Sequence, residues 1–171
     1  MKIMITGYSG SGKSTLCRKL HERYHVPELH LDMVQFLPNW EVRAEAEKQE
    51  IVRAFLDDHP DGWVIDGNYS GLSYERRCSE ADVIIQMLFG RLECLFRCAR
   101  RYRMYQGKSR PDMAEGCNEK LDGEFVRWIL WESRSPKIRA RYRLVREQYP
   151  EKVVVIRNQR QLNAYLKTLD R

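Results

Sequence analysis

Residues 7–14 read GYSGSGKS, which satisfies the pattern G-x-x-x-x-G-K-[ST] without a mismatch. The apolar run of residues 2–6 precedes this stretch, and residues 15–21 follow it with the 3.6-residue periodicity of a helix. A glycine-rich turn between a strand and a helix directs backbone N–H groups, and the positive end of the helix dipole, toward anionic oxygens. The stretch therefore predicts a phosphate-binding loop. The alternative is a turn without a ligand.

The residue types of this loop suit a polyphosphate bound with a metal ion. Lys13 is expected to reach the β- and γ-phosphates, and the Ser14 hydroxyl is expected to ligate Mg²⁺. We therefore expect ATP and Mg²⁺ as cofactors. The predicted nucleotide-binding residues are Gly7, Ser9, Gly10, Ser11, Gly12, Lys13, Ser14 and Thr15.

Length and composition suit one globular unit. The chain has 171 residues, 43% of them hydrophobic, and we expect residues 1–171 to form a single domain. Because the N-terminal apolar run leads into the loop, and no run approaches the roughly 20 residues that cross a bilayer, we expect a soluble, cytoplasmic protein. The five cysteines lack metal-site spacing and the four histidines lack partners at catalytic spacing, so neither set is assigned a role.

Positive charge is concentrated in two segments. The net charge is +6, and the basic residues cluster within 91–110 and 134–146. Arginine binds phosphate groups in a bidentate manner, so such clusters suit nucleotide phosphates or nucleic acid. The alternative, which we prefer for the second cluster, is a solvated helix face.

Alternating strand and helix patterns predict an α/β fold. Four further apolar runs cover residues 27–32, 63–66, 81–88 and 152–156. Helical patterns cover residues 13–24, 41–57, 71–79, 90–106, 121–133, 136–148 and 159–168. We expect a three-layer fold with a five-stranded parallel sheet flanked by helices. The polar stretch 106–120 is expected to be a mobile lid loop.

Other features distinguish among phosphate-loop proteins. A GTPase would carry an N-K-x-D motif after a late strand, and residues 155–159 offer none. Helicases and transport ATPases generally need a longer chain and further motifs. Small kinases of the nucleotide and shikimate type fit the length, the expected strands and the arginine-rich lid.

Several segments resemble those of bacterial DNA topology modulation proteins, a family related to adenylate kinase. They are HLD at 30–32, PNW at 38–40, WVIDGNYS at 63–70, KSRPDM at 108–113 and GCNEKL at 116–121. This similarity covers most of the chain. It implies an adenylate-kinase-like P-loop fold and phosphoryl transfer, while the family name implies an effect on DNA topology.

Two aspartates are candidate catalytic residues. Asp66 ends a strand expected beside the phosphate-loop strand, where a carboxylate holds Mg²⁺ directly or through water in related ATPases. Asp32 is expected to end the second strand and to orient the acceptor hydroxyl or accept its proton. The alternatives are a turn residue for Asp66 and a helix N-cap for Asp32.

Four arginines complete the candidate site. Arg97 and Arg101 lie one helical turn apart, and the resemblance to adenylate kinase implies a pair that clamps the phosphates. Arg43, at the start of the second helix, and Arg110, in the lid, are predicted to bind the acceptor together with Asp32. A solvated surface position is the alternative for these arginines.

These observations favour an ATP-dependent kinase of a small molecule, with a nucleoside or nucleotide among the candidate acceptors. The second hypothesis is a nucleotide-dependent DNA-binding regulator, whose phosphate contacts would come from the two basic clusters. No helix-turn-helix, zinc or ribbon motif supports it. The third hypothesis is a non-catalytic nucleotide-binding partner of another protein.

Overall fold

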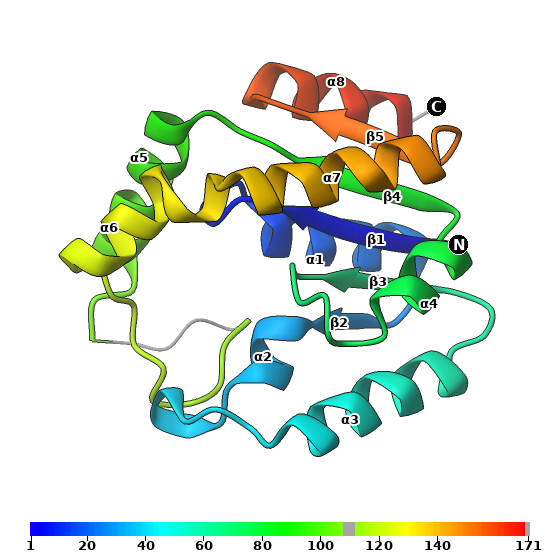
Figure 1. The fold of residues 1–171 in the computed structure, drawn as a ribbon, viewed down its shortest axis with the longest axis horizontal. Coiled ribbons are helices and arrows are strands. Elements are labelled where there is room, and N and C mark those ends of the chain that lie inside the picture. The colour runs from blue at the N-terminus through cyan, green and yellow to red at the C-terminus, as the bar shows by residue number, and fades with distance from the viewer. Residues whose placement is uncertain (108–111, 170–171) are drawn as a thin grey trace.

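Five strands form one parallel sheet in the computed structural model, which describes residues 1–107 and 112–169 (Figure 1). The order across the sheet is β2-β3-β1-β4-β5. The strands are β1 (Lys2–Gly7), β2 (Glu28–His30), β3 (Trp63–Asp66), β4 (Val83–Met87) and β5 (Val153–Ile156). The predicted α/β class and five-stranded parallel sheet are confirmed.

Helices cover both faces of the sheet, with α1 on one face and α4 and α7 on the other (Figure 1). The longer helices are α1 (Lys13–Tyr24), α3 (Glu45–Asp58), α4 (Tyr74–Glu80), α5 (Arg91–Met104), α6 (Gly123–Leu130), α7 (Pro136–Gln148) and α8 (Gln159–Leu169). The short elements are α2 (Leu31–Gln35), η1 (Pro38–Trp40) and η2 (Glu132–Arg134).

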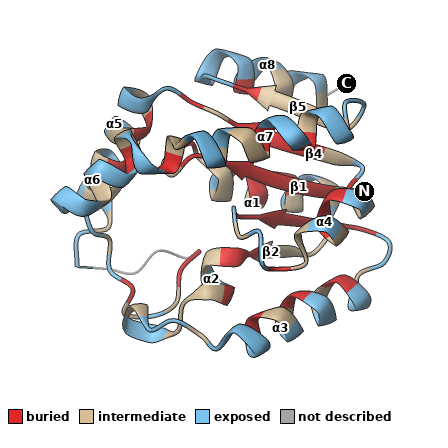
Figure 2. Ribbon diagram, in the orientation of Figure 1, coloured by how far each residue is buried: buried red, intermediate tan, exposed pale blue. Residues whose placement is uncertain are grey.

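The central strands are buried on both faces (Figure 2). Successive residues of a strand point to opposite faces, so β1 contributes to two cores. Ile3 and Ile5 belong to a cluster with Leu16 of α1. Met4 belongs to a second cluster with Val52 of α3. This double burial explains why the strands read as continuous apolar runs.

Two predicted boundaries near the candidate acceptor residues are wrong. The second strand ends at His30, because its partner β3 ends at Asp66, which is opposite His30 in the ladder. Asp32 therefore lies in the first turn of α2 and does not end a strand. The second long helix starts at Glu45, so Arg43 precedes it, next to the isolated bridge between Phe36 and Val42.

Part of the predicted lid packs against η1. The backbone N–H of Asn39 donates to the Glu115 carbonyl, and the Trp40 indole N–H donates to the Asn118 carbonyl. The Cys117 side chain is buried at this contact. Residues 108–111 of the lid, including Arg110, lie outside the described residues. Of the helices that the structure describes, none is long and apolar enough to cross a membrane.

Candidate active site

The phosphate loop runs from the end of β1 to the first turn of α1, at the edge of the sheet where the strands end. Its glycines are required by the backbone. Gly10 has φ +78°, and a Cβ there would lie 2.5 Å from the Cys94 carbonyl oxygen. A Cβ on Gly7, with φ +144°, would collide with the Met87 backbone. The loop therefore needs a bare backbone at both positions.

The three predicted nucleotide-binding residues at the start of α1 have different environments. The Lys13 ammonium donates to the Tyr8 carbonyl at 3.2 Å, so it folds over the loop. The Ser14 hydroxyl donates to Asp66 Oδ2 at 2.9 Å. Thr15 is exposed. The structure thus brings Lys13 to the loop and Ser14 to the end of β3.

Asp66 is the buried centre of the site, with 4% of its surface exposed. It ends β3, which lies between β1 and β2. One oxygen accepts the Ser14 hydrogen bond, and Oδ1 lies 2.5 Å from His30 Nδ1. A buried carboxylate beside a serine hydroxyl is a set of hard oxygen donors that fits Mg²⁺. Ser14 and Asp66 are therefore the residues that could hold the metal ion.

His30 is a site residue that sequence reasoning missed. Burial disfavours the charged imidazolium, but the hydrogen bond to Asp66 and the negative charges of Asp66 and Glu28 outweigh it, so the pKa of His30 is raised. The sequence feature that could have identified His30 is its position at the end of a strand. Two polar residues end adjacent parallel strands, and their side chains meet at the same edge of the sheet.

The segment after β3 is hydrogen-bonded to the start of the phosphate loop. Asn68 receives a hydrogen bond from the Gly7 N–H at 2.9 Å and returns one to the Gly7 carbonyl at 2.6 Å. The Tyr142 hydroxyl also donates to Asn68. Asn68 thus fixes the point where the strand becomes the loop.

Asp32 is linked to the same segment by Tyr69. The Tyr69 hydroxyl donates to Asp32 Oδ1 at 2.8 Å. Burial and the nearby Asp32 charge raise the pKa of Tyr69, so its hydroxyl stays protonated and remains a donor. The Arg77 guanidinium holds the backbone of this segment, because it donates to the Tyr69 and Leu72 carbonyls at 2.6 and 2.8 Å.

A cavity of about 290 Å³ lies next to Tyr69. Lys48 is buried there and pairs with Glu45 at 2.7 Å and with the Gln35 side chain at 3.1 Å. Asn68 also lines this cavity. Sequence reasoning missed Lys48, which reads as a polar helix residue and becomes a lining residue only when α3 packs beside α2.

Arg43 lines a different cavity, of about 470 Å³, beside β2. Its Nε donates to the Val34 carbonyl at 3.0 Å, and its guanidinium pairs with Glu47. The structure does not bring Arg43 to the cavity next to Tyr69. The second long helix was predicted to start at residue 41, but α3 starts at Glu45, so Arg43 lies in the segment before the helix.

The two predicted clamp arginines make different contacts. Arg97 donates to the Ser11 carbonyl of the phosphate loop at 3.1 Å, and it also binds Glu93 and Gln159. Arg101 instead pairs with Glu119 at 2.9 Å. The structure brings Arg97 against the loop and leaves Arg101 attached to the segment that follows residues 108–111.

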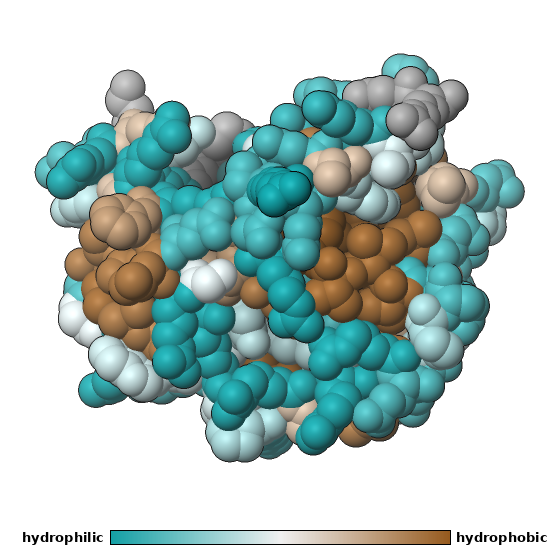
Figure 3. Space-filling view, turned by 90° about the horizontal axis from the view of Figure 1, so that it is seen from above, coloured by the Kyte–Doolittle hydropathy of each residue, from teal (hydrophilic) through white to brown (hydrophobic). Residues whose placement is uncertain are grey.

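Aromatic side chains flank the outer side of the loop. The Trp128 indole N–H donates to the Ser9 hydroxyl at 3.4 Å, and Arg134 stacks on the Tyr8 ring at 3.8 Å. The end of the molecule formed by α5 and α6 shows apolar side chains at its surface (Figure 3). The exposed apolar residues of these helices include Leu92, Phe96 and Trp128.

The family comparison agrees with the geometry. Residues 3–101, more than half of the chain, match a family model described as an AAA domain. The matched span starts in β1, contains the phosphate loop and Asp66, and ends in α5 at Arg101. A comparison with curated proteins found no match.

Proposed function

The chain belongs to the AAA domain family of P-loop proteins, and from that premise we propose that it is an ATP-dependent phosphotransferase acting on a small molecule. Membership implies nucleotide binding, with Mg²⁺ as the usual companion ion. The observation that carries the finer proposal is the position of Asp66. Asp66 accepts a hydrogen bond from the Ser14 hydroxyl of the phosphate loop, and it lies three residues before Tyr69, whose hydroxyl donates to Asp32.

The nucleotide would be held by the loop backbone. N–H groups around Gly10 and Gly12, with the Lys13 ammonium, would neutralise the phosphate oxygens. Mg²⁺ would supply further neutralisation, held by Ser14 and Asp66. The contact between Arg97 and the Ser11 carbonyl supports a role for Arg97 next to the phosphates.

The acceptor would lie in the cavity bordered by Tyr69 and Lys48. Tyr69 lines this cavity, and its hydroxyl donates to Asp32 Oδ1, which fixes the carboxylate behind it. Asp32 Oδ2 would receive the acceptor proton. The acceptor oxygen bonds to the γ-phosphorus while the bond from that phosphorus to the leaving ADP oxygen breaks. Lys48 and Gln35 offer polar groups to a hydroxylated or anionic small molecule, including a nucleoside or nucleotide.

Turnover against a panel of acceptors tests this proposal. The purified chain would be incubated with Mg·ATP and with nucleosides, nucleotides and small hydroxy acids, and ADP formation would be measured. We expect acceptor-dependent ADP formation with at least one class, abolished in Lys13→Met. Intact ATP binding without turnover for any acceptor would contradict a kinase and favour a non-catalytic nucleotide-binding partner.

DNA binding is the second candidate, in line with the resemblance to DNA topology modulation proteins. It is supported by Arg91, Arg100 and Arg103, which are exposed on α5. Fluorescence anisotropy with duplex DNA should then show an affinity that falls steeply with salt and drops in the Arg100→Ala/Arg103→Ala variant. No binding at low salt would remove this candidate.

A further inference from the structure

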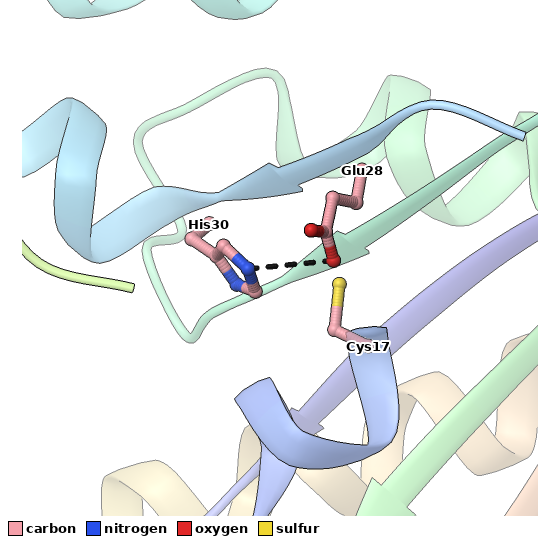
Figure 4. A group of neighbouring side chains, drawn as sticks. All are labelled: Cys17, Glu28 and His30. Atoms are coloured by element: carbon pink, nitrogen blue, oxygen red, sulfur yellow. Dashed lines mark ion pairs between the residues drawn. The ribbon is translucent and has the colours of Figure 1, made fainter. Parts of the chain in front are cut away.

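Cys17, Glu28 and His30 bring three different ligand types together behind the candidate active site (Figure 4). Glu28 and His30 alternate on β2 and so point to the same face, where α1 presents Cys17. One thiol sulfur, one carboxylate oxygen and one imidazole nitrogen all lie within 4.8 Å of one another. His30 Nε2 is 3.4 Å from Glu28 Oε2.

The bonding of Glu28 indicates that this cluster can accept a cation. Its Oε2 atom is buried and has no hydrogen-bond partner of normal geometry, although His30 Nε2 is nearby. A buried carboxylate oxygen without a hydrogen bond carries a desolvation cost that a bound cation would offset. Burial, with the charges of Asp66 and Glu28, also raises the pKa of the Cys17 thiol, and the positive charge of a bound cation would oppose this shift.

The second ring nitrogen of His30 is already oriented. Nδ1 lies 2.5 Å from Asp66 Oδ1, which leaves Nε2 directed toward Cys17 and Glu28. Metal-binding histidines commonly donate their other N–H to a carboxylate in this way, which fixes both the tautomer and the ring orientation. The outer ligand shell therefore exists before any metal binds.

We propose that Cys17, Glu28 and His30 form a binding site for one Zn²⁺-type divalent cation. Thiolate, carboxylate and neutral imidazole groups are each zinc ligands in proteins, and the two negative charges of this set balance the ion. Tetrahedral coordination places ligand atoms about 3.3–3.8 Å apart, so small side-chain rotations suffice. Binding releases the Cys17 proton, and a second proton from any His30 that is protonated.

The 470 Å³ cavity beside β2 gives the ion access and a fourth ligand. Glu28 and His30 both line this cavity, together with Arg18, Arg43 and apolar side chains. Arg18 pairs with Asp112 at 3.5 Å and Arg43 pairs with Glu47, so each guanidinium charge is directed toward its own carboxylate. A water molecule from the cavity would complete the coordination.

The site would be coupled to nucleotide binding through one side chain. Asp66 contacts His30 with one oxygen and the Ser14 hydroxyl with the other. A bound cation would hold His30 neutral and fix it, and His30 would in turn fix the Asp66 carboxylate. We therefore expect zinc occupancy to change the affinity for Mg·ATP, while zinc binding itself needs no nucleotide.

Metal titration of the full chain tests the site without reference to activity. Zn²⁺ would be titrated against a chromophoric chelator with Mg²⁺ in excess, and Co²⁺ would be used to record the thiolate-to-metal charge-transfer band and the visible bands of tetrahedral coordination. We expect one ion per chain. Cys17→Ala and the isosteric Glu28→Gln should each weaken binding by about 100-fold or more.

Cys78→Ala is the matched control, because Cys78 is a buried cysteine whose sulfur contacts Met4 in the opposite core. It should bind Zn²⁺ like the wild-type chain, and far-ultraviolet circular dichroism should show that all three variants are folded. No stoichiometric uptake by the wild-type chain, a Co²⁺ spectrum without the thiolate band, or unchanged affinity in Cys17→Ala would overturn the proposal. The three residues would then be a buried hydrogen-bonding cluster only.

Discussion

The Ser14 hydroxyl donates a hydrogen bond to the Asp66 carboxylate, with 2.9 Å between Oγ and Oδ2. The two residues meet because β1 and β3 are adjacent and Asp66 is opposite Ile5 in the ladder. Strand pairing therefore fixes the position of the Asp66 carboxylate relative to the phosphate loop. A metal ion between them would replace this hydrogen bond with two oxygen ligands.

Asp66→Asn tests the charge at this position. The amide has nearly the shape of the carboxylate and can still accept from Ser14, but it cannot neutralise a metal ion. We expect Mg²⁺-dependent turnover to fall by about 100-fold or more, measured as ADP formation across a Mg²⁺ titration. Asp82→Asn, at an exposed carboxylate before β4, is the control. Equal activity in both variants would argue against Asp66 as a metal ligand.

Lys13→Met tests the phosphate contact. The Lys13 ammonium lies over the loop, bonded to the Tyr8 carbonyl, and is positioned to leave it for a phosphate oxygen. We expect ATP affinity, measured by calorimetry, to weaken by about 10-fold or more, because a charge-assisted hydrogen bond is lost. Lys19→Met, at an exposed lysine of α1, should leave affinity unchanged. An unaltered ATP affinity in Lys13→Met would remove the basis of the nucleotide site.

Asp32 and Tyr69 should separate in a kinetic comparison. Asp32→Asn removes the proposed proton acceptor, so kcat should fall by about 100-fold or more. Tyr69→Phe removes only the hydrogen bond that holds Asp32, so a smaller loss of kcat is expected. Equal losses of kcat in the two variants would show that Asp32 acts only through the local structure.

The sequence predicted the parts of the site that follow from local patterns. The phosphate loop is one contiguous motif, and Asp66 ends an apolar run, so both were visible in the sequence. The sheet followed from alternating strands and helices. These features depend on neighbours along the chain, and the predicted sheet is confirmed.

Other parts of the site depend on pairing between distant segments. His30 contacts Asp66 because β2 and β3 end at the same point in the ladder, and a scattered histidine carries no sign of that. β2 ends at His30 because β3 ends at Asp66. The sequence does not show where β3 stops pairing, so Asp32 was wrongly predicted to end a strand. Lys48 reaches the cavity next to Tyr69 through the packing of α3, and Asn68 reaches Gly7 of the phosphate loop through the turn after β3. Residue spacing encodes neither contact.

Arg77 and Arg76 give a matched stability test on one helix. Arg77 is fully buried, with two hydrogen bonds to the backbone of residues 69–72, and burial lowers its pKa to about 10. Arg76 is partly exposed and pairs with Asp57 and Glu80. Lysine at position 77 cannot reach both carbonyls, so Arg77→Lys should lower the free energy of unfolding by about 2–3 kcal/mol.

Arg76→Lys should cost less than about 1 kcal/mol, since exposed ion pairs contribute little. Urea unfolding of both variants measures the difference. Because Arg77 holds the Tyr69 carbonyl, Arg77→Lys should also reduce kcat under conditions where the variant remains folded. If both substitutions cost the same, the buried guanidinium does not anchor the turn after β3, and Tyr69 must be positioned by its own packing and its bond to Asp32.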